Sequence, residues 1–251
     1  MAAHCLMQQA QLETRKPVIG STRHLDPDTS SRAETYRTVQ RREWASFNFL
    51  ESAMQTDVVE LPVLYFGTPV ALISSVNPDG ATNLSPISSY WALSDTILIG
   101  LSTAGRCYSN ILLRPEAVLN LPDASLWKNV EAIAATTGSE VVPDDKKQMG
   151  YRFERDKFRC ADLNTKASEC IAPDRVAECP VQIEARLVRM HKIGSGDDAM
   201  VAAELKALRI HIHTDLLAPI GWIDVKRWKP LHYVFRHYYT LGECLGENFR
   251  A

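Results

Sequence analysis

Long apolar runs are missing from this chain. The longest, such as Val70 to Val76 and Thr96 to Leu101, fall far short of the ~18 residues that a membrane-spanning helix needs. The start of the chain lacks a cationic stretch followed by an apolar core, and Glu13 and Asp26 do not fit an acidic-poor transit peptide. The sequence therefore predicts a cytoplasmic protein with no membrane segment.

An excess of charge of one sign is also missing. The chain has 28 Lys+Arg against 30 Asp+Glu, which gives a formal net charge of −2. The basic residues are scattered among acidic ones, so the sequence shows no electrostatic footprint for nucleic acid. We expect no nucleic-acid partner.

Glycine, proline and cysteine are too few or too scattered for several classes of protein. The 12 Gly and 13 Pro make up about a tenth of the chain, close to average usage, which excludes collagen and a long flexible linker. The six cysteines form no CxxC pair, so we expect free thiols in a reducing compartment. Except for Cys107, these cysteines are expected to be packing residues.

Several catalytic signatures are absent. No GxGxxG, GxxxxGK[ST] or GxSxG motif is present, which leaves dinucleotide-fold, P-loop and hydrolase interpretations without support. His211 and His213 form a His-x-His pair, but no cysteine or carboxylate stands at a ligand spacing nearby. We therefore predict no metal site.

What is present begins with a polar extension, residues 1–60, and continues with a domain over residues 61–251. Residues 1–35 are expected to be loosely ordered, with a short helix around Arg41 to Met54. From Leu61 onward, short β-rich runs alternate with turn residues. This change in composition predicts an N-terminal extension before a single folded domain.

A β-hairpin is predicted at Asn77 to Gly80. The sequence Asn-Pro-Asp-Gly supplies a proline for the first turn position and a glycine able to adopt positive φ, between two apolar runs. Further β-rich runs, SYWAL and TILIGLS, follow at once. The region is typical of an antiparallel meander.

Helical patterns interrupt the strands. Tyr108 to Leu113 is predicted to be a short helix that ends before Pro115, followed by a strand from Ala117 to Leu121. Residues 126–137 place apolar groups at helical spacing, and Gly138 is a plausible stop.

Two alternating stretches follow later in the chain. Residues 181–193 and 208–213 alternate apolar and polar side chains with period two, the pattern of strands with one buried face. Residues 196–207, GDDAMVAAELKA, are expected to form a connecting helix with acidic residues at its start. This order of elements favours an antiparallel β-barrel with helical decoration, mainly β and α+β in strict class terms, over a doubly wound parallel sheet.

Two loops carry residues suited to ligand binding. Residues 83–91 offer serine hydroxyls and backbone N–H groups to an anion and an aromatic wall to a flat ring. Residues 102–110 combine Arg106 with a helix start, which suits phosphate. An ST-turn with Tyr90 and Trp91 in the core, and ordinary N-capping by Ser109 or Thr103, would explain the same residues without a ligand.

The order of motifs through these loops resembles the flavin reductase-like family of FMN-binding split β-barrel proteins. The resemblance starts with PVALISS, NLSPISSYW, GRCYSNI and VLNLP, and continues with DKF, SECIAP, ECPVQIEA and the ending PLHYVFRHYYTLGE. It covers about residues 61–251.

The resemblance implies a split barrel that binds FMN at a homodimer interface. The family's Asn-x-Ser/Ala-Pro-x-Ser pattern would line the flavin, and its phosphate-binding Lys-Thr pair falls on Arg106 and Cys107. The thiol is a departure, because it is a weak donor where a threonine hydroxyl would bind phosphate; Ser102 or Ser109 could supply that hydroxyl. The residues implied in cofactor binding are Asn83, Ser85, Pro86, Ser88, Ser89, Tyr90, Ser102, Arg106, Cys107, Ser109 and Asn110.

The activity implied is that of an FMN-dependent oxidoreductase. It would either act on a small organic substrate, or reduce flavin with NADH or NADPH and pass it to a separate monooxygenase. A non-catalytic flavin or haem binding protein, and a barrel that has lost FMN, are the alternatives. His213 could donate a proton near the flavin, since imidazole titrates near neutral pH, although a partly exposed strand position would explain it too.

Two further expectations concern the surroundings of the barrel. The N-terminal extension is long enough to close over a pocket beside the flavin. The run Asp144 to Lys147 is expected to be a solvated helix edge.

Overall fold

The computed structural model describes residues 55–194, 200–219 and 221–249. The predicted helix at Arg41 to Met54 and the predicted loose order of residues 1–35 lie outside these ranges. The chain divides into two compact units, Leu12–Pro62 and a larger one that contains Val63–Ala251. Residues 55–62, the described part of the smaller unit, form no helix or strand. The description below concerns the larger unit.

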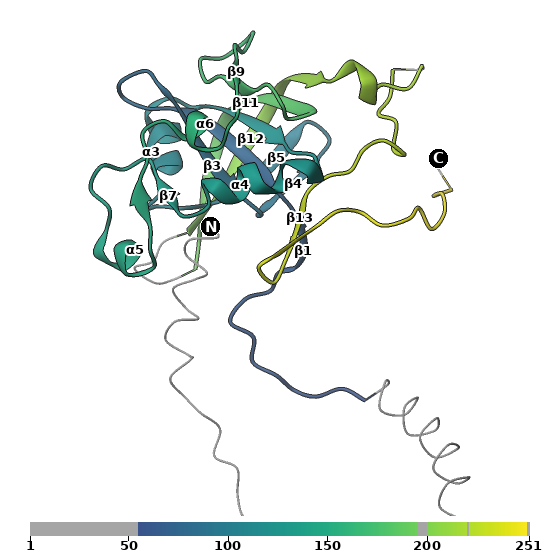
Figure 1. Ribbon diagram of the computed structural model, residues 1–251, viewed down its shortest axis with the longest axis horizontal. Helices are drawn as coiled ribbons and strands as arrows, with labels where there is room; N and C mark the ends of the chain where they lie inside the picture. Colours follow the sequence, from purple (N-terminus) through teal and green to yellow (C-terminus); the bar gives the residue numbers. More distant parts are fainter. Residues whose placement is uncertain (1–54, 195–199, 220, 250–251) are drawn as a thin grey trace, which may run out of the picture. The chain divides into compact units, whose positions relative to one another are not determined.

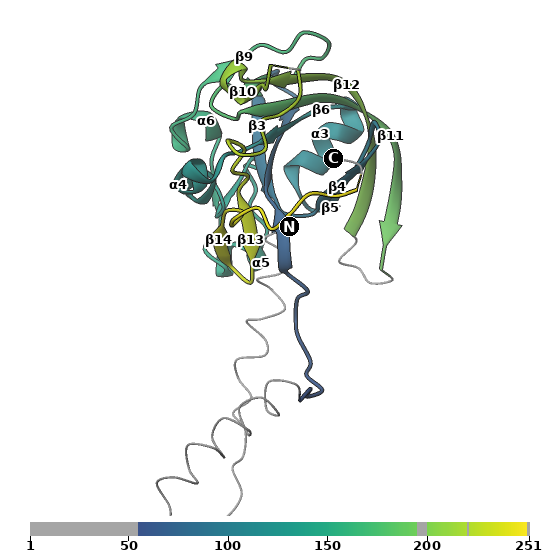
Figure 2. The same cartoon turned by 90° about the vertical axis from the view of Figure 1, so that its right-hand side faces the viewer.

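A seven-stranded antiparallel sheet forms the barrel, in the order β3-β2-β6-β11-β12-β5-β4. The end strands β3 and β4 are joined by only two residues, Ser88 and Ser89, so the sheet must curve until its two ends meet. Figure 2 shows this curvature, with helix α3 lying inside it. The strands are β2 (Ala71–Val76), β3 (Thr82–Ile87), β4 (Tyr90–Leu93), β5 (Thr96–Ser102), β6 (Glu116–Leu121), β11 (Val181–Ile193) and β12 (Met200–Ile212).

Smaller elements surround the barrel. Besides α3 (Arg106–Leu113), the helices are α4 (Trp127–Ala132), α5 (Asp144–Gln148) and α6 (Lys157–Cys160), with 3-10 turns at Ala124–Leu126 and Thr214–Leu216. The strand groups are β1 (Phe66–Pro69) with β13 (His232–Val234) and β14 (His237–Tyr239), the parallel pair β7 (Thr136–Thr137) and β8 (Arg152–Phe153), and β9 (Thr165–Lys166) with β10 (Arg175–Val176). Figure 1 shows the arrangement. Among the described residues, no helix is long and apolar enough to span a membrane.

The hairpin predicted at Asn77 to Gly80 is confirmed. Strands β2 and β3 pair in antiparallel register from Ala71 opposite Ile87 to Val76 opposite Thr82. The Asn77 N–H donates to the Ala81 carbonyl at 2.8 Å, and Gly80 has φ of +87°. Glycine suits this position because it adopts positive φ without a steric penalty.

Two apolar clusters form the core. One lies inside the curved sheet and includes Ile73, Ile99 and Leu205 together with Ile111 of α3. The other lies on the outer side of β2 and β3, where Leu72 and Leu84 pack with Phe158 of α6, Val130 of α4 and Leu231 just before β13. Because consecutive residues of β2 face opposite sides, this strand is buried on both faces and contributes to both clusters. The buried strands therefore fix the positions of α3, α4 and α6.

The predicted helix over residues 196–207 is wrong. Residues from Met200 onward form β12, which pairs with β11 on one side and with β5 on the other. Val201, Ala203 and Leu205 are buried with period two. Two flanking strands supply hydrogen bonds along the whole segment, and this tertiary pairing overrides the helix propensity of its Ala, Glu and Lys residues. Residues 196–199 lie outside the described ranges.

The helix predicted over residues 126–137 is wrong in extent. Helix α4 ends at Ala132, and Thr136–Thr137 form β7. The Thr136 hydroxyl donates to the Ile133 carbonyl at 2.8 Å, which closes the turn. The early end of α4 leaves residues 134–138 free to line the cleft described next.

Candidate functional site: a cationic cleft at the start of helix α3

A cleft opens at the N-terminus of α3, and we call it the cationic cleft. The strand ends of β3 and β5 form one wall, and residues from β7, α5 and α6 form the other. Its lining residues are Ser85, Pro86, Ile87, Leu101, Ser102, Gly105, Arg106, Cys107, Tyr108, Ala134, Thr136, Thr137, Gly138, Lys146, Tyr151 and Lys157.

Three side chains give the cleft its charge. Arg106 donates from Nε to the Gly138 carbonyl at 2.9 Å, Lys146 donates from Nζ to the Ala104 carbonyl at 3.1 Å, and Lys157 donates from Nζ to the Leu84 carbonyl at 2.8 Å. Among the described residues that line the cleft, none is Asp or Glu. Backbone carbonyls thus orient three cations that no lining carboxylate neutralises.

Lys157 is the most deeply placed of the three cations, with only 3% of its surface exposed. Burial lowers its pKa to about 8, because removal of water disfavours the charged form. An ammonium group has three donors, and the bond to Leu84 uses one of them. A buried ammonium with donors to spare is suited to a bound anion.

Lys146 corrects a prediction. The run Asp144 to Lys147 was expected to be a solvated edge, and Asp144 and Lys147 do form an exposed ion pair. Lys146, however, turns inward from α5 and is buried, which lowers its pKa. A one-turn helix must direct some side chains toward the protein, and charge patterning alone does not indicate which ones.

The N-terminus of α3 has no side-chain cap. Its N-cap residue is Gly105, and the first turn contains no acidic residue. The capping alternative, in which Ser109 or Thr103 fills this role, is therefore not what the structure shows. The first N–H groups of a helix have no partner within the helix and carry partial positive charge, so they add to the attraction of the cleft for an anion.

Cys107 is buried within the first turn of α3 and packs with the inner core cluster. Burial raises the pKa of its thiol to about 11, which outweighs the opposing effects of a hydrogen bond with Ser75 and the nearby Lys157 charge. The thiol therefore remains protonated at neutral pH and is unsuited to be a nucleophile.

The structure brings only some of the sequence-predicted residues into the cleft. Ser85, Pro86, Ser102, Arg106 and Cys107 line it. Asn83 lies close behind the lining, where its amide donates to the Ser85 hydroxyl at 3.1 Å.

Other sequence-predicted residues point elsewhere. The Asn110 amide donates to Ser75 and Asn77 inside the protein, and the Ser89 hydroxyl donates to the Gly100 carbonyl. Ser109 is exposed outside the cleft lining. Tyr90 packs against the inner core, and burial raises its pKa to about 12.

Ser88 lines a second, apolar hollow beside the cleft, which we call the Ser88 hollow. Its Oγ is buried and has no hydrogen-bond partner among the described residues, and only 6% of the residue's surface is exposed. A buried hydroxyl without a partner is uncommon in proteins, so a ligand atom is a natural partner for it. The hollow is lined by Val70, Pro86, Ile87, Ser88, Val130, Ala134, Tyr233 and Tyr238.

The histidines lie away from the cleft. His213 bonds through Nε2 to the Ala177 carbonyl at 2.9 Å and is not among the cleft residues. His211 is a partly exposed residue of β12, as predicted, and its Nε2 is 2.7 Å from Oε1 of Glu184, which is fully buried. Over the described ranges, no group of three or more His, Cys, Asp or Glu gathers as a metal site would require.

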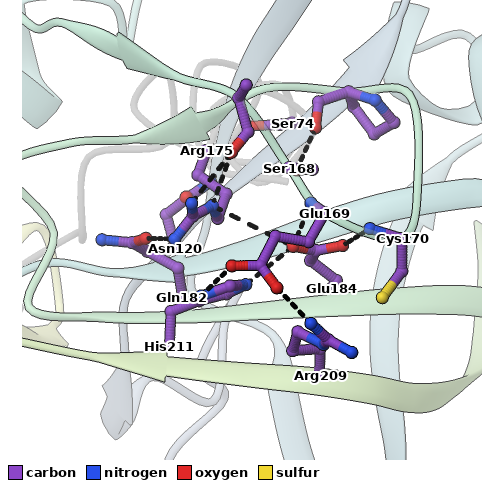
Figure 3. Close-up of polar contacts among 12 residues, drawn as sticks. Ser74, Asn120, Ser168, Glu169, Cys170, Arg175, Gln182, Glu184, Arg209 and His211 are labelled. Atoms are coloured by element: carbon purple, nitrogen blue, oxygen red, sulfur yellow. Dashed lines mark hydrogen bonds and ion pairs between the residues drawn. The ribbon is translucent and has the colours of Figure 1, made fainter.

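Glu184 anchors a loop on the barrel, as Figure 3 shows. One carboxylate oxygen accepts the Glu169 N–H at 2.8 Å and the other accepts the Cys170 N–H at 2.7 Å. Burial raises the pKa of Glu184, but these two hydrogen bonds and the contact with His211 lower it by a larger amount. The net pKa shift is downward. The network holds residues 169–170 in place and serves the fold rather than the cleft.

Sequence reasoning missed several cleft residues: Thr136, Thr137, Gly138, Lys146, Tyr151 and Lys157. Lys157 belongs to the DKF motif noted in the family resemblance, and that motif was the one available signal. The others come from short elements whose position depends on the packing of α4, α5 and α6.

The chain matches the family described as flavin reductase like domain over residues 63–242. It is 36% identical over 189 residues to YdfE of Bacillus subtilis strain 168, an uncharacterized protein, and the match covers 75% of this chain and 91% of YdfE.

Solved structures agree with this result. Flavoredoxin of Desulfovibrio vulgaris (Miyazaki F) superposes with a TM-score of 0.64 at 20% identity, over 79% of this chain and 99% of that one. Nitrilotriacetate monooxygenase component B from Bacillus cereus superposes with a TM-score of 0.58 at 20% identity, over 91% and 100%.

The fold is therefore an antiparallel split β-barrel with an anion-attracting cleft at its inner helix. The chain belongs to the flavin reductase-like domain family. Both the fold class and the family predicted from the sequence motifs are confirmed.

Proposed function

We propose that this protein is a flavin-dependent oxidoreductase that holds the phosphate of FMN in the cationic cleft. The observation that carries the proposal is the set of three cations, Arg106, Lys146 and Lys157, around an uncapped helix N-terminus, with no lining carboxylate. A phosphate monoester carries nearly two negative charges at neutral pH and several acceptor oxygens, so it matches this set of donors.

The size of the cleft supports a site for one end of the cofactor only. It encloses about 80 Å³, well below the ~300–1,000 Å³ of sites that enclose a whole small ligand. The flavin ring would lie outside it, along Pro86 to Ser88, where the unpartnered Ser88 hydroxyl offers a hydrogen bond. Asn83, Ser85 and Ser102 would orient the chain between ring and phosphate.

Bound flavin would supply the redox chemistry by accepting and donating hydride or electrons. Two activities fit. The protein would reduce flavin with NADH or NADPH for a separate monooxygenase, or it would keep FMN and act on a small organic substrate. The second reading is favoured by a groove that continues from the flavin site, described below.

A homodimer belongs to the proposal. Large apolar side chains are exposed on the barrel strands, including Trp91 and Leu93 of β4, Val188 of β11 and Ile210 of β12. A two-fold pairing would bury such side chains and add a second wall beside a narrow cleft. Light scattering that gave a monomer at micromolar concentration would contradict this part.

Titration of the purified protein with FMN tests the proposal. Binding should shift the flavin absorbance bands, and Arg106→Ala should weaken binding at least about tenfold, because a charge-assisted hydrogen bond contributes roughly 1.5–3 kcal/mol. Arg114→Ala is the matched control, since Arg114 is exposed at the other end of α3. Equal affinities for both variants would remove Arg106 from the phosphate site.

The same titration with riboflavin, which lacks the phosphate, tests the assignment of the cleft. The Arg106→Ala substitution should leave riboflavin affinity unchanged. A protein that binds FMN but oxidises neither NADH nor NADPH, and reduces no acceptor, would be a flavin binder instead of an enzyme.

A further inference from the structure

A third hollow lies between α4 and the β13–β14 hairpin, and we call it the aromatic groove. Its volume is about 510 Å³, within the range of small-molecule sites. It is lined by Ala124, Trp127, Leu231, Arg236, His237, Tyr238, Tyr239 and Thr240.

The aromatic groove continues from the proposed flavin site. Tyr238 lines both the aromatic groove and the Ser88 hollow. Pro86, Ile87 and Ala134 line both the Ser88 hollow and the cationic cleft. Three hollows therefore follow one another from the start of α3 to the hairpin, and a molecule in the aromatic groove would lie at the ring end of a flavin whose phosphate is in the cleft.

The walls of the groove suit a flat ring. The rings of Trp127 and Tyr238 lie 6.1 Å apart at 38°, and Tyr238 also meets Tyr233 edge to face at 5.6 Å. Trp127 and Tyr239 nevertheless leave 43% and 54% of their surfaces exposed. Aromatic faces that are held in place yet open to solvent favour stacking with another aromatic ring.

The charges at the groove favour an anion. Lys128 lies over the Trp127 ring, with Nζ 5.6 Å from its centroid. The Glu131 carboxylate is engaged by the Tyr238 hydroxyl at 2.9 Å. Over the described part of the chain, the Arg236 guanidinium makes no hydrogen bond or ion pair, so its donors remain open to a ligand.

The backbone that presents Arg236 is strained. Phe235 and Arg236, the two turn residues between β13 and β14, have φ of +41° and +70°, where glycine or asparagine is usual. The Phe235 N–H donates to the Tyr65 carbonyl at 3.1 Å, and its ring packs at 88° on Phe66 with centroids 5.0 Å apart. Strain of this kind persists only where surrounding contacts impose it, and it concentrates at functional sites.

We propose that the aromatic groove binds a planar aromatic substrate that carries an anionic group, with the ring on Trp127 and Tyr238 and the anion on Arg236. The inference rests on the proposed flavin function, because it places this substrate beside the flavin ring. It deepens that function by naming the substrate class.

Arg236→Gly separates binding from folding. Glycine adopts positive φ freely, so the variant should melt at the same temperature as wild type or higher. Titration of the flavin-free protein with 2-naphthoate and with its neutral isostere 2-naphthamide, followed by tryptophan fluorescence, measures the groove itself. We expect wild type to prefer the carboxylate at least about tenfold and the Arg236→Gly variant to lose this preference.

A second variant tests whether the aromatic ring of the ligand stacks on Trp127. Trp127→Leu should weaken both probes to a similar degree, because it removes stacking and leaves the charge. The groove proposal is overturned if wild type binds the two probes equally, or if Arg236→Gly keeps the preference for the carboxylate.

NADH joins an aromatic ring to anionic phosphates and therefore shares this chemistry. Titration of NADH against bound 2-naphthoate distinguishes NADH from an organic acid as the ligand of the groove. Lack of competition assigns the groove to an organic acid. Competition that Arg236→Gly abolishes assigns it to the electron donor, NADH. FMN affinity, measured separately, should be equal in wild type and Arg236→Gly. Failure of wild type to bind FMN would contradict the proposed function while leaving the naphthoate result readable.

Discussion

Arg106 and Gly138 join the start of α3 to the turn after β7, through a hydrogen bond of 2.9 Å from Nε to the carbonyl oxygen. The side chains of Asn83 and Arg106 both lie close to the Gly138 Cα. A Cβ at position 138 would lie 2.5 Å from Asn83 Oδ1 and 3.0 Å from Arg106 Cγ. The cleft therefore requires a residue without a side chain at this position.

Gly138→Ala should disturb the cleft directly. Asn83 and Arg106 would have to move apart, at a cost of roughly 1–3 kcal/mol of folding free energy. FMN affinity should fall as well, because the new Cβ pushes the Arg106 side chain away from its position against the carbonyl of residue 138. Thermal melting and FMN titration measure the two effects.

Gly242→Ala is the control for this substitution. A Cβ there would meet nothing within 4 Å, and its φ lies outside the left-handed region. Equal behaviour of the two alanine variants would show that the contact at Gly138 relaxes without consequence.

Lys157 should make stability rise with pH in the mildly alkaline range. Its pKa is lowered from 10.5 to about 8 in the folded protein, so between these values the unfolded chain binds more protons. The contribution of Lys157 to the free energy of unfolding should therefore increase as pH rises through this window, by about 3 kcal/mol at full effect, whereas the raised thiol pKa of Cys107 acts in the opposite direction above about pH 9. Urea denaturation of wild type and Lys157→Met at several pH values isolates this contribution, since the variant should lack the rise.

Anion binding should reverse the shift at Lys157. A phosphate in the cleft favours the charged ammonium and raises its pKa, so FMN binding at pH 8–9 should take up protons. Calorimetry in buffers of different ionisation enthalpy detects this uptake. A binding enthalpy independent of the buffer would place the phosphate away from Lys157.

Glu184 should contribute acid-sensitive stability. Its pKa is lowered in the folded state, so the stabilisation is complete above the ordinary glutamate value of about 4.3 and is lost as pH falls below it. Glu184→Gln should cost about 3 kcal/mol at pH 7, because the amide nitrogen would face one of the two N–H groups of Glu169 and Cys170 and the carboxylate charge is lost. The gap between variant and wild type should narrow at acid pH in urea denaturation.

A surface pair in the same sheet supplies the comparison for Glu184. His191 and Glu204 lie 3.2 Å apart but are partly exposed. Exposed ion pairs contribute little, so Glu204→Gln should change stability by less than about 1 kcal/mol. A large loss there would show that burial does not explain the effect at Glu184.

The cysteines should differ sharply in reactivity. Cys107 and Cys179 are buried with raised thiol pKa values, whereas Cys170 and Cys244 are exposed. Iodoacetamide at pH 8 should label the exposed pair quickly and the buried pair only after unfolding. Mass spectrometry of peptides after timed labelling measures this, and rapid labelling of native Cys107 would show that the first turn of α3 opens.

Local patterns predicted the strands well where the period was clear. Residues 181–187 alternate apolar and polar side chains, and β11 spans Val181–Ile193 with the predicted bounds. The alternation in 200–207 was hidden by alanine, glutamate and lysine, which favour helices, and only pairing with β5 and β11 decided the outcome.

The residues of the candidate site also fall into those that local sequence predicted and those that only tertiary packing brought to the cleft. Arg106, Ser85 and Ser102 lie in short motifs next to a turn or a helix start, so their place in the cleft could be predicted from neighbours in the chain. Lys146 and Lys157 reach the cleft from short helices α5 and α6, about forty and fifty residues after Arg106.

The sequence by itself determined the family, the antiparallel barrel and the placement of Arg106 at the start of α3, because each was read from motifs of residues close together along the chain. The tertiary structure alone decided the three-cation cleft, the unpartnered Ser88 hydroxyl and the groove that ends at Arg236. Burial, lost solvation and strained backbone arise only when distant segments pack, and no local pattern encodes them.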